Sequence, residues 1–212
     1  MSRRIGYIFA AHHIFQNTMP DDEMTGDMFL FVRTETKAGP AETARAKAGL
    51  VERISAGDED AFGELYDRYA PMAHGIVLSR VPRDEVDDIV QEVFISAYKN
   101  LGNLRDKNAI GAWLAMIARN KATEYYRRAK PADELSEDLT QKNDARTEAN
   151  EIMAAIRTLP NTFKETLMLR LVEGMTGQEI AEQTGLAPDS VRVNLHRGMK
   201  MLREKLGIEV KR

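Results

Sequence analysis

The sequence predicts an all-α protein made of two small helical domains joined by a flexible linker. Apolar residues recur three and four positions apart in several successive segments, as the buried face of a helix requires. Proline and glycine separate these segments, and both residues commonly end helices. A polar stretch without an apolar stripe divides the segments into two groups, which indicates a linker between two domains.

The chain divides into four parts. Residues 1–48 mix glycine, proline, threonine and charged residues without a sustained period, so we expect a mobile N-terminal extension. Residues 49–130 should form the first domain and residues 148–212 the second. Between them, residues 131–147 are rich in acidic, amide and hydroxyl side chains and should form the linker.

Three helices should build the first domain. Apolar residues at helical spacing predict the first helix from Phe62 to Ile76. After Pro82 breaks the chain, the same spacing predicts a second helix from Val86 to Leu101. A third helix should run from Trp113 to Tyr125 and end before Pro131. Trp113 lies on the apolar stripe of this helix, so we expect it in the core.

The second domain carries the clearest signals for helix ends. One helix should run from Phe163 to Val172 and stop at Gly174. Thr176 and Glu179 fit a capping box, in which each side chain binds the backbone amide of the other residue at a helix start. They predict a short helix from Gly177 to Thr184.

A last helix should follow a turn at Gly185. Pro188 is compatible with its first turn, and apolar residues from Val191 to Leu206 keep to a single inward stripe. We expect Asp189 to cap this helix, because a carboxylate at a helix start accepts hydrogen bonds from free backbone amides.

The last two helices have the spacing of a helix-turn-helix. Ile180 and Ala181 would pack closely, Gly185 would allow the turn, and Val191 would begin the inward stripe of the second helix. That helix would enter the major groove of DNA, where its outward polar residues could contact phosphates or base edges. These residues are Ser190, Arg192, Asn194, His196 and Arg197. The pattern also fits a generic helical hairpin with a solvated face.

Charge is segregated along the chain, although the net charge is only −3. Residues 57–92 are acidic, whereas residues 105–130 and 192–205 carry an excess of lysine and arginine. Basic surfaces attract phosphates, so the two basic runs suggest two contacts with DNA. The acidic stripe from Asp84 to Glu92 lies opposite the core face of its helix, and such runs also occur simply as solvated surfaces.

Several classes of function find no support in the sequence. A chain without cysteine has no disulfide, thiolate metal site or thiol redox switch. No apolar run approaches the ~20 residues that span a bilayer, and a secretory cleavage pattern is absent, so we expect a cytoplasmic protein without membrane insertion. No nucleophile, metal-ligand set or phosphate loop accompanies the carboxylates, so we expect no catalytic residue, metal or cofactor, and a hydrolase or transferase is disfavoured.

Three motifs carry a family resemblance. Residues 88–94 are similar to the signature of sigma region two, and residues 113–128 match its continuation. Residues 159–160, 179–181, 190–192 and 195–197 look like sigma region four. The motifs follow the family's order and cover about residues 50–206, which makes them far more specific together than any one alone. The chain therefore resembles an extracytoplasmic-function sigma factor of the sigma-70 family, a sigma subunit of RNA polymerase.

The resemblance implies a non-enzymatic alternative sigma factor. Such a subunit binds core RNA polymerase and directs promoter recognition, melting and transcription initiation. An anti-sigma factor is a further implied partner. One rival interpretation is a stand-alone helix-turn-helix regulator whose N-terminal helices serve dimerisation or another interaction. The signature at residues 88–94 argues against this rival.

The resemblance also implies three binding surfaces. The clamp of the largest polymerase subunit should meet Asp87, Asp88, Gln91 and Glu92, while the flap of the second subunit is a further expected contact. The minus-ten promoter element should meet the third helix and the preceding loop through Asn103, Arg105, Lys107, Arg119, Asn120, Lys121, Tyr125, Arg127 and Arg128. The minus-thirty-five element should meet the last helix through Ser190, Arg192, Asn194, His196, Arg197 and Lys200. Asn194 departs from the family, in which arginine is common at this position.

Overall fold

A computed structural model describes residues 40–129 and 144–208, and every regular element in these two ranges is a helix. The first group of helices comprises α2 (Pro40–Ser55), α3 (Glu59–Leu78), α4 (Val86–Asn100) and α5 (Ile110–Ala129), with short 3-10 helices at Arg83–Glu85, Leu101–Asn103 and Lys107–Ala109. The second group comprises α6 (Asp144–Arg157), α7 (Asn161–Leu171), α8 (Gly177–Thr184) and α9 (Pro188–Lys205). The predicted all-α, two-domain fold class is confirmed.

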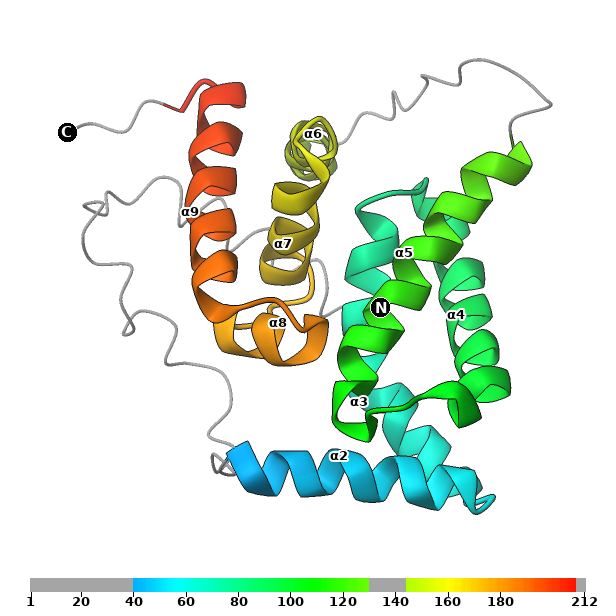
Figure 1. Ribbon diagram of the computed structural model, residues 1–212. Helices are drawn as coiled ribbons and strands as arrows, with labels where there is room; N and C mark the ends of the chain where they lie inside the picture. Colours follow the sequence, from blue (N-terminus) through cyan, green and yellow to red (C-terminus); the bar gives the residue numbers. More distant parts are fainter. Residues whose placement is uncertain (1–39, 130–143, 209–212) are drawn as a thin grey trace.

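Helices α3, α4 and α5 pack against one another, and α2 lies across one end of this bundle (Figure 1). The buried face of α3 includes Leu65, Tyr69, Met72 and Ile76, which follow the three-and-four spacing of the sequence. Asp58 begins α3 by accepting a hydrogen bond of 3.0 Å from the backbone N–H of Ala61. The apolar periodicity therefore predicts both the helix and its inward face.

Two helices begin inside segments for which the sequence predicted no regular structure. Helix α2 begins at Pro40, within the expected extension, and α6 begins at Asp144, within the expected linker. The apolar residues that anchor α2, Leu50, Val51 and Ile54, all lie in its last two turns. Because the preceding turns are rich in alanine, they have helix propensity without an apolar stripe to reveal it. The rest of the expected extension and linker lies outside the described residues.

The second domain contains the predicted helix-turn-helix in α8 and α9. The hydroxyl of Thr176 accepts a 3.1 Å hydrogen bond from the backbone N–H of Glu179, whose carboxylate accepts one of 2.7 Å in return. Gly185 ends α8 with φ of 75°, a left-handed conformation that favours glycine. The capping box, the turn glycine and Pro188 at the start of α9 are confirmed.

The expected cap at Asp189 is wrong. The N-cap of α9 is Ala187, and no side chain makes a capping hydrogen bond there. Pro188 occupies the first helical position, so Asp189 is the second helical residue and lies two positions beyond the N-cap. Its carboxylate instead forms an exposed ion pair with Arg192 at 3.4 Å. The negative charge of Asp189 still interacts favourably with the positive end of the helix dipole.

The two domains pack directly against each other. Helix α3 contacts α7 and α8, while α5 contacts α8, and Figure 1 shows α8 beside the α3–α5 bundle. The buried apolar residues of both domains form one continuous cluster. The described residues of the two domains thus form a single packed body.

Candidate nucleic-acid interface

Helix α4 presents an acidic face to solvent. Asp87, Asp88 and Gln91 are exposed, whereas Glu92 is half-buried. The opposite face is buried through Ile89, Val90, Val93, Phe94 and Ala97. The three-and-four spacing of these apolar residues turns the carboxylates outward, where they can meet a basic protein surface.

Exposed apolar side chains continue the acidic face toward the end of α4. Ile95 is 48% exposed and Tyr98 57%, while Tyr66 on α3 is 44% exposed. The rings of Tyr66 and Phe94 lie 4.6 Å apart, and those of Phe62 and Tyr98 lie 5.0 Å apart. Tyr66 and Tyr98 fall on the three-and-four apolar spacing of their helices, and this spacing predicts that they are buried. The structure corrects this expectation and adds an apolar area beside the carboxylates.

Glu92 belongs to an ion-pair cluster with α5. Its carboxylate lies 3.2 Å from the ammonium of Lys121 and 3.3 Å from the guanidinium of Arg128. Glu124 contacts the same two cations at 3.2 Å and 2.8 Å. Hydrogen bonds from Arg128, and then from Lys121, lower the pKa of both carboxyls below their usual value. Glu92, which was expected to bind polymerase, therefore shares one cluster with Lys121 and Arg128, which were expected at the minus-ten element. The ion pairs of this cluster are solvent-exposed, so they add little stability and can exchange partners.

Most other expected minus-ten residues line the outside of α5 and the loop before it. Asn103, Arg105, Asn120 and Arg127 are exposed, and Lys107 pairs with Glu52 at 2.8 Å. At ~1.5 Å of rise per residue, the length of α5 separates the loop from Arg127 by about 25 Å. These side chains do not converge on one point but form a line. Such a line suits an extended strand of nucleic acid.

The aromatic residues of α5 differ in their surroundings. Tyr125 is half-buried against the core, and its ring centre lies 5.3 Å from that of Tyr126, which is 47% exposed. The hydroxyl of Tyr126 donates a hydrogen bond of 2.8 Å to the carbonyl oxygen of Arg80. Trp113 packs against the core, as its position on the apolar stripe predicted.

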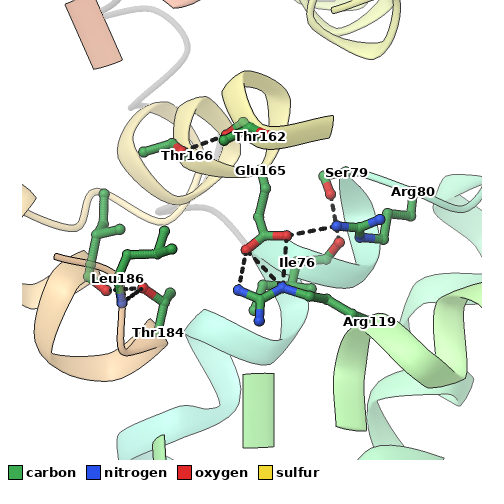
Figure 2. A network of polar contacts seen from close by, with 10 residues as sticks. Ile76, Ser79, Arg80, Arg119, Thr162, Glu165, Thr166, Thr184 and Leu186 are labelled. Carbon is green, nitrogen blue, oxygen red and sulfur yellow. Dashed lines mark hydrogen bonds and ion pairs between the residues drawn. The ribbon is translucent and has the colours of Figure 1, made fainter. Parts of the chain in front are cut away.

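Arg119 lies in a different setting from the other expected minus-ten residues. Its guanidinium donates hydrogen bonds of 2.6 to 3.2 Å to the carboxylate of Glu165 on α7 (Figure 2). Arg80, at the end of α3, donates to the same carboxylate at 2.8 Å. Glu165 is only 5% exposed, so its charge is compensated almost entirely by these two cations. Arg119 thus joins the first domain to the second.

The outward face of α9 carries most of the residues expected to contact duplex DNA. Ser190, Arg192, His196, Arg197 and Lys200 are exposed. Asn194 is only 8% exposed, because it falls on the inward face between Val191 and Gly198. Its side chain is therefore placed with the core and not with the other expected contacts.

Two other kinds of site find no support in the part of the chain that the structure describes. No three histidine, cysteine or acidic side chains within residues 40–129 and 144–208 gather as they would around a metal ion. None of the helices in these ranges is both long and apolar enough to cross a membrane.

Two family models match the chain, one for each domain. The model of sigma-70 region 2 matches residues 65–132, and that of sigma-70 region 4 matches residues 149–202. The extracytoplasmic-function (ECF) RNA polymerase sigma-E factor of Haemophilus influenzae is 33% identical over 176 residues, covering 74% of this chain and 93% of the relative. The chain belongs to the ECF sigma factors. It is accordingly an alternative sigma factor that directs transcription initiation.

Two further comparisons agree with this assignment. The RNA polymerase sigma factor CarQ of Myxococcus xanthus is 30% identical over 167 residues, covering 74% of this chain and 95% of the relative. A solved structure of CnrH in complex with the cytosolic domain of CnrY is similar with a TM-score of 0.55 and 26% identity. It covers 76% of this chain and 97% of CnrH. The family inferred from three motifs is confirmed.

The sequence reasoning missed the residues of this sigma factor that join region 2 to region 4. Glu165 and Arg80 carried no expected role, although both are central to the contact in Figure 2. One signal was present, because Met168 and Leu169 follow Leu167 directly and all three are fully buried. Consecutive apolar residues on a helix point in different directions and indicate packing on two sides.

Proposed function

We propose that this sigma factor binds core RNA polymerase through α4 of region 2 and contacts the promoter through α5 and α9. The observation that carries the proposal is the segregation of charge on exposed helix faces that take no part in packing. Acidic groups gather on α4, while α5 and α9 carry exposed cations. One chain therefore offers an acidic surface for a basic protein and two basic surfaces for phosphates.

The proposed polymerase contact combines charge with apolar area. Asp88, Gln91, Ile95 and Tyr98 are exposed and follow one another at helical spacing, so they form a single stripe along α4. The carboxylates would steer encounter with a basic surface and set its register. The apolar end would supply the desolvated contact in which binding energy usually concentrates. The clamp of the largest subunit is the proposed partner of this stripe.

The two proposed DNA contacts differ in the form of DNA they suit. The line of cationic and amide side chains from the loop to the end of α5, with the exposed ring of Tyr126 near its end, suits the unpaired minus-ten element, since single-strand binding combines cations with stacking platforms. Helix α9 suits the duplex of the minus-thirty-five element, because it is the second helix of a helix-turn-helix and presents Arg192 and Arg197 outward. Holding one strand unpaired would assist promoter melting.

We further propose a regulated, non-enzymatic subunit that works in the cytoplasm beside RNA polymerase. Its regulation would come from an anti-sigma factor. The complex of CnrH with the cytosolic domain of CnrY supports this, because CnrH has the same fold and binds a second protein. An anti-sigma factor of this kind would compete for the surfaces assigned above to polymerase and promoter.

Reconstitution with core RNA polymerase tests the proposal. The sigma factor and core enzyme are incubated with random-sequence promoter libraries, and transcripts that depend on the sigma factor are sequenced. We expect initiation downstream of a shared pair of elements. Promoter DNA bound by the free protein, without any transcript from the holoenzyme, would instead identify a stand-alone helix-turn-helix regulator.

The polymerase contact is tested separately by charge reversal. Asp88→Arg should weaken the affinity for core enzyme about 10-fold or more, because it sets a like charge against a basic surface. Asp67→Arg is the matched control, since Asp67 is also exposed but lies on α3. Fluorescence anisotropy of the labelled sigma factor measures both affinities. Equal affinities of the two variants would remove α4 from the interface.

A further inference from the structure

One apolar side chain stays uncovered on α9, the second helix of the helix-turn-helix. Val193 is 39% exposed, and it is the only exposed large apolar residue among the side chains described in residues 149–208. The other large apolar residues of α9 are buried or half-buried, because this helix packs against α6, α7 and α8. Val193 belongs neither to the buried cluster nor to the described residues that pack against it.

The position of Val193 on α9 is opposite the buried stripe. Each residue turns an α-helix by about 100°, so Val193 lies about 200° around the helix axis from the buried Val191. The exposed Lys200 falls at nearly the same angle as Val193, and the exposed Arg197 within about 40° of it. Val193 therefore occupies the middle of the face that is proposed to meet duplex DNA.

Helix stability does not account for a valine at this position. Valine is β-branched and loses side-chain freedom in a helix, so it is a weaker helix former than lysine, arginine or glutamate. An exposed side chain also gains little free energy from burial. Isolated apolar residues are common on protein surfaces, so it is the place of Val193 among the expected DNA contacts that matters.

Val193 stands between two polar side chains in one row along α9. Ser190 lies three residues before it and Arg197 four residues after it, and both are exposed. Asn194, which was expected to contact DNA, is only 8% exposed and lies on the inward face. The second turn of α9 therefore offers DNA a valine in place of the expected amide.

Thymine carries the apolar group that base pairs show in the major groove. Its 5-methyl group marks T·A and A·T pairs, whereas the other base edges in this groove present hydrogen-bond donors and acceptors. Val193 lies within the first two turns of α9, and the N-terminal residues of such a helix are those that contact base edges. The isopropyl group of a valine can exclude water from a methyl group but cannot satisfy a hydrogen-bonding edge.

We propose that Val193 reads the 5-methyl group of a thymine in the minus-thirty-five element. The inference rests on the proposed function, in which α9 meets the duplex of that element. Val193 and Arg197 are four residues apart, which is about 6 Å along the helix axis, and base pairs are stacked ~3.4 Å apart. The thymine therefore lies within about two base pairs of the base pair nearest to Arg197.

Replacement of thymine by deoxyuridine tests this inference, because uracil has the same hydrogen-bonding groups and lacks only the methyl group. A promoter recovered with the holoenzyme from the random-sequence library is synthesised with one deoxyuridine at a time, at each thymine of the minus-thirty-five element in either strand. Each modified promoter competes with the unmodified promoter for holoenzyme. We expect one thymine whose replacement weakens binding about 4-fold, as the loss of one buried methyl group predicts.

Two variants show whether Val193 causes this preference. Val193→Ser removes both methyl groups of the valine, and serine has a helix propensity close to that of valine, so α9 should stay intact. Holoenzyme with Val193→Ser should bind the thymine promoter and the deoxyuridine promoter equally. Lys200→Ala is the matched control, because Lys200 lies on the same face about two turns further along α9. It should weaken binding to both promoters and leave their ratio as in the parent.

Three results would overturn the reading of thymine by Val193. They are a minus-thirty-five element in which no thymine responds to deoxyuridine, a preference that persists in Val193→Ser, and a preference that is also lost in Lys200→Ala. Absence of any transcript that depends on the sigma factor would contradict the proposed function, and the role of Val193 would fall with it. Sigma-dependent transcripts from promoters that are indifferent to deoxyuridine would contradict only the role of Val193.

Discussion

Neutralising Glu165 should destabilise region 2, although Glu165 belongs to region 4. Glu165→Gln keeps the size of the side chain but removes the charge that Arg80 and Arg119 share. The two guanidiniums would then face each other across a neutral amide. Both arginines belong to region 2, and each would lose the negative charge that neutralises it. The free energy of unfolding of region 2 should therefore fall.

The exposure of the three side chains sets the magnitude. Breaking a buried ion pair by removing one partner costs about 3–5 kcal/mol. The side chains of Arg80 and Arg119 are 19% and 31% exposed, so water recovers part of this loss. We expect the free energy of unfolding to fall by about 2–3 kcal/mol. With a urea slope of about 2 kcal/mol per molar, the midpoint should move by about 1 M.

The single tryptophan of the chain makes the assay specific. Trp113 lies on α5, so its fluorescence during urea denaturation reports on region 2. Glu151→Gln, at an exposed position of α6, is the control for loss of one negative charge. The urea midpoint followed by Trp113 fluorescence should move further in Glu165→Gln than in Glu151→Gln. Equal shifts would refute the reasoning, because region 2 would then unfold independently of its contact with region 4.

Three further predictions concern single helices. Thr176→Ala removes one half of the capping box and should lower the stability of region 4 by about 1 kcal/mol, measured by urea denaturation followed by circular dichroism. Hydrogen bonds from the backbone of Ala61 and from Arg53 lower the pKa of Asp58, so its contribution to stability should be present above about pH 4 and be lost as the pH falls further. Asp58→Asn keeps a cap and should flatten this acid dependence in denaturation curves; an unchanged curve would contradict the assignment. Arg197→Ala should weaken minus-thirty-five binding by about 1–3 kcal/mol if the residue reads a base, and a loss equal on all duplexes would identify a phosphate contact instead.

Local signals predicted the local structure well. The apolar stripes located α3, α4, α5 and α9, and the motif of Thr176 and Glu179 predicted the start of α8. Gly185 predicted the turn, because a left-handed backbone excludes most other residues. These features depend on residues a few positions apart, so one sequence contains all the information that they require.

Features that depend on distant contacts were not predictable in the same way. Asn194 was expected on the DNA-facing side, yet Gly198 lets Phe163 and Leu167 approach α9 closely at that level of the helix and Asn194 turns inward. Arg119 was expected at DNA because the family resemblance implies it and the residue lies in a basic run, but its partner Glu165 lies 46 positions away. Charge pattern and spacing cannot reveal which of two distant helices a side chain will meet.

The exposed face of α9 has a consequence for measurement. Because the contact between the domains involves α7 and α8, it leaves Arg192, Arg197 and Lys200 uncovered. A minus-thirty-five duplex would therefore meet the same surface of α9 whether or not the two regions stay in contact, and a titration with that duplex alone would return one affinity for both arrangements. A probe must engage region 2, or bridge the two domains, before it can distinguish them.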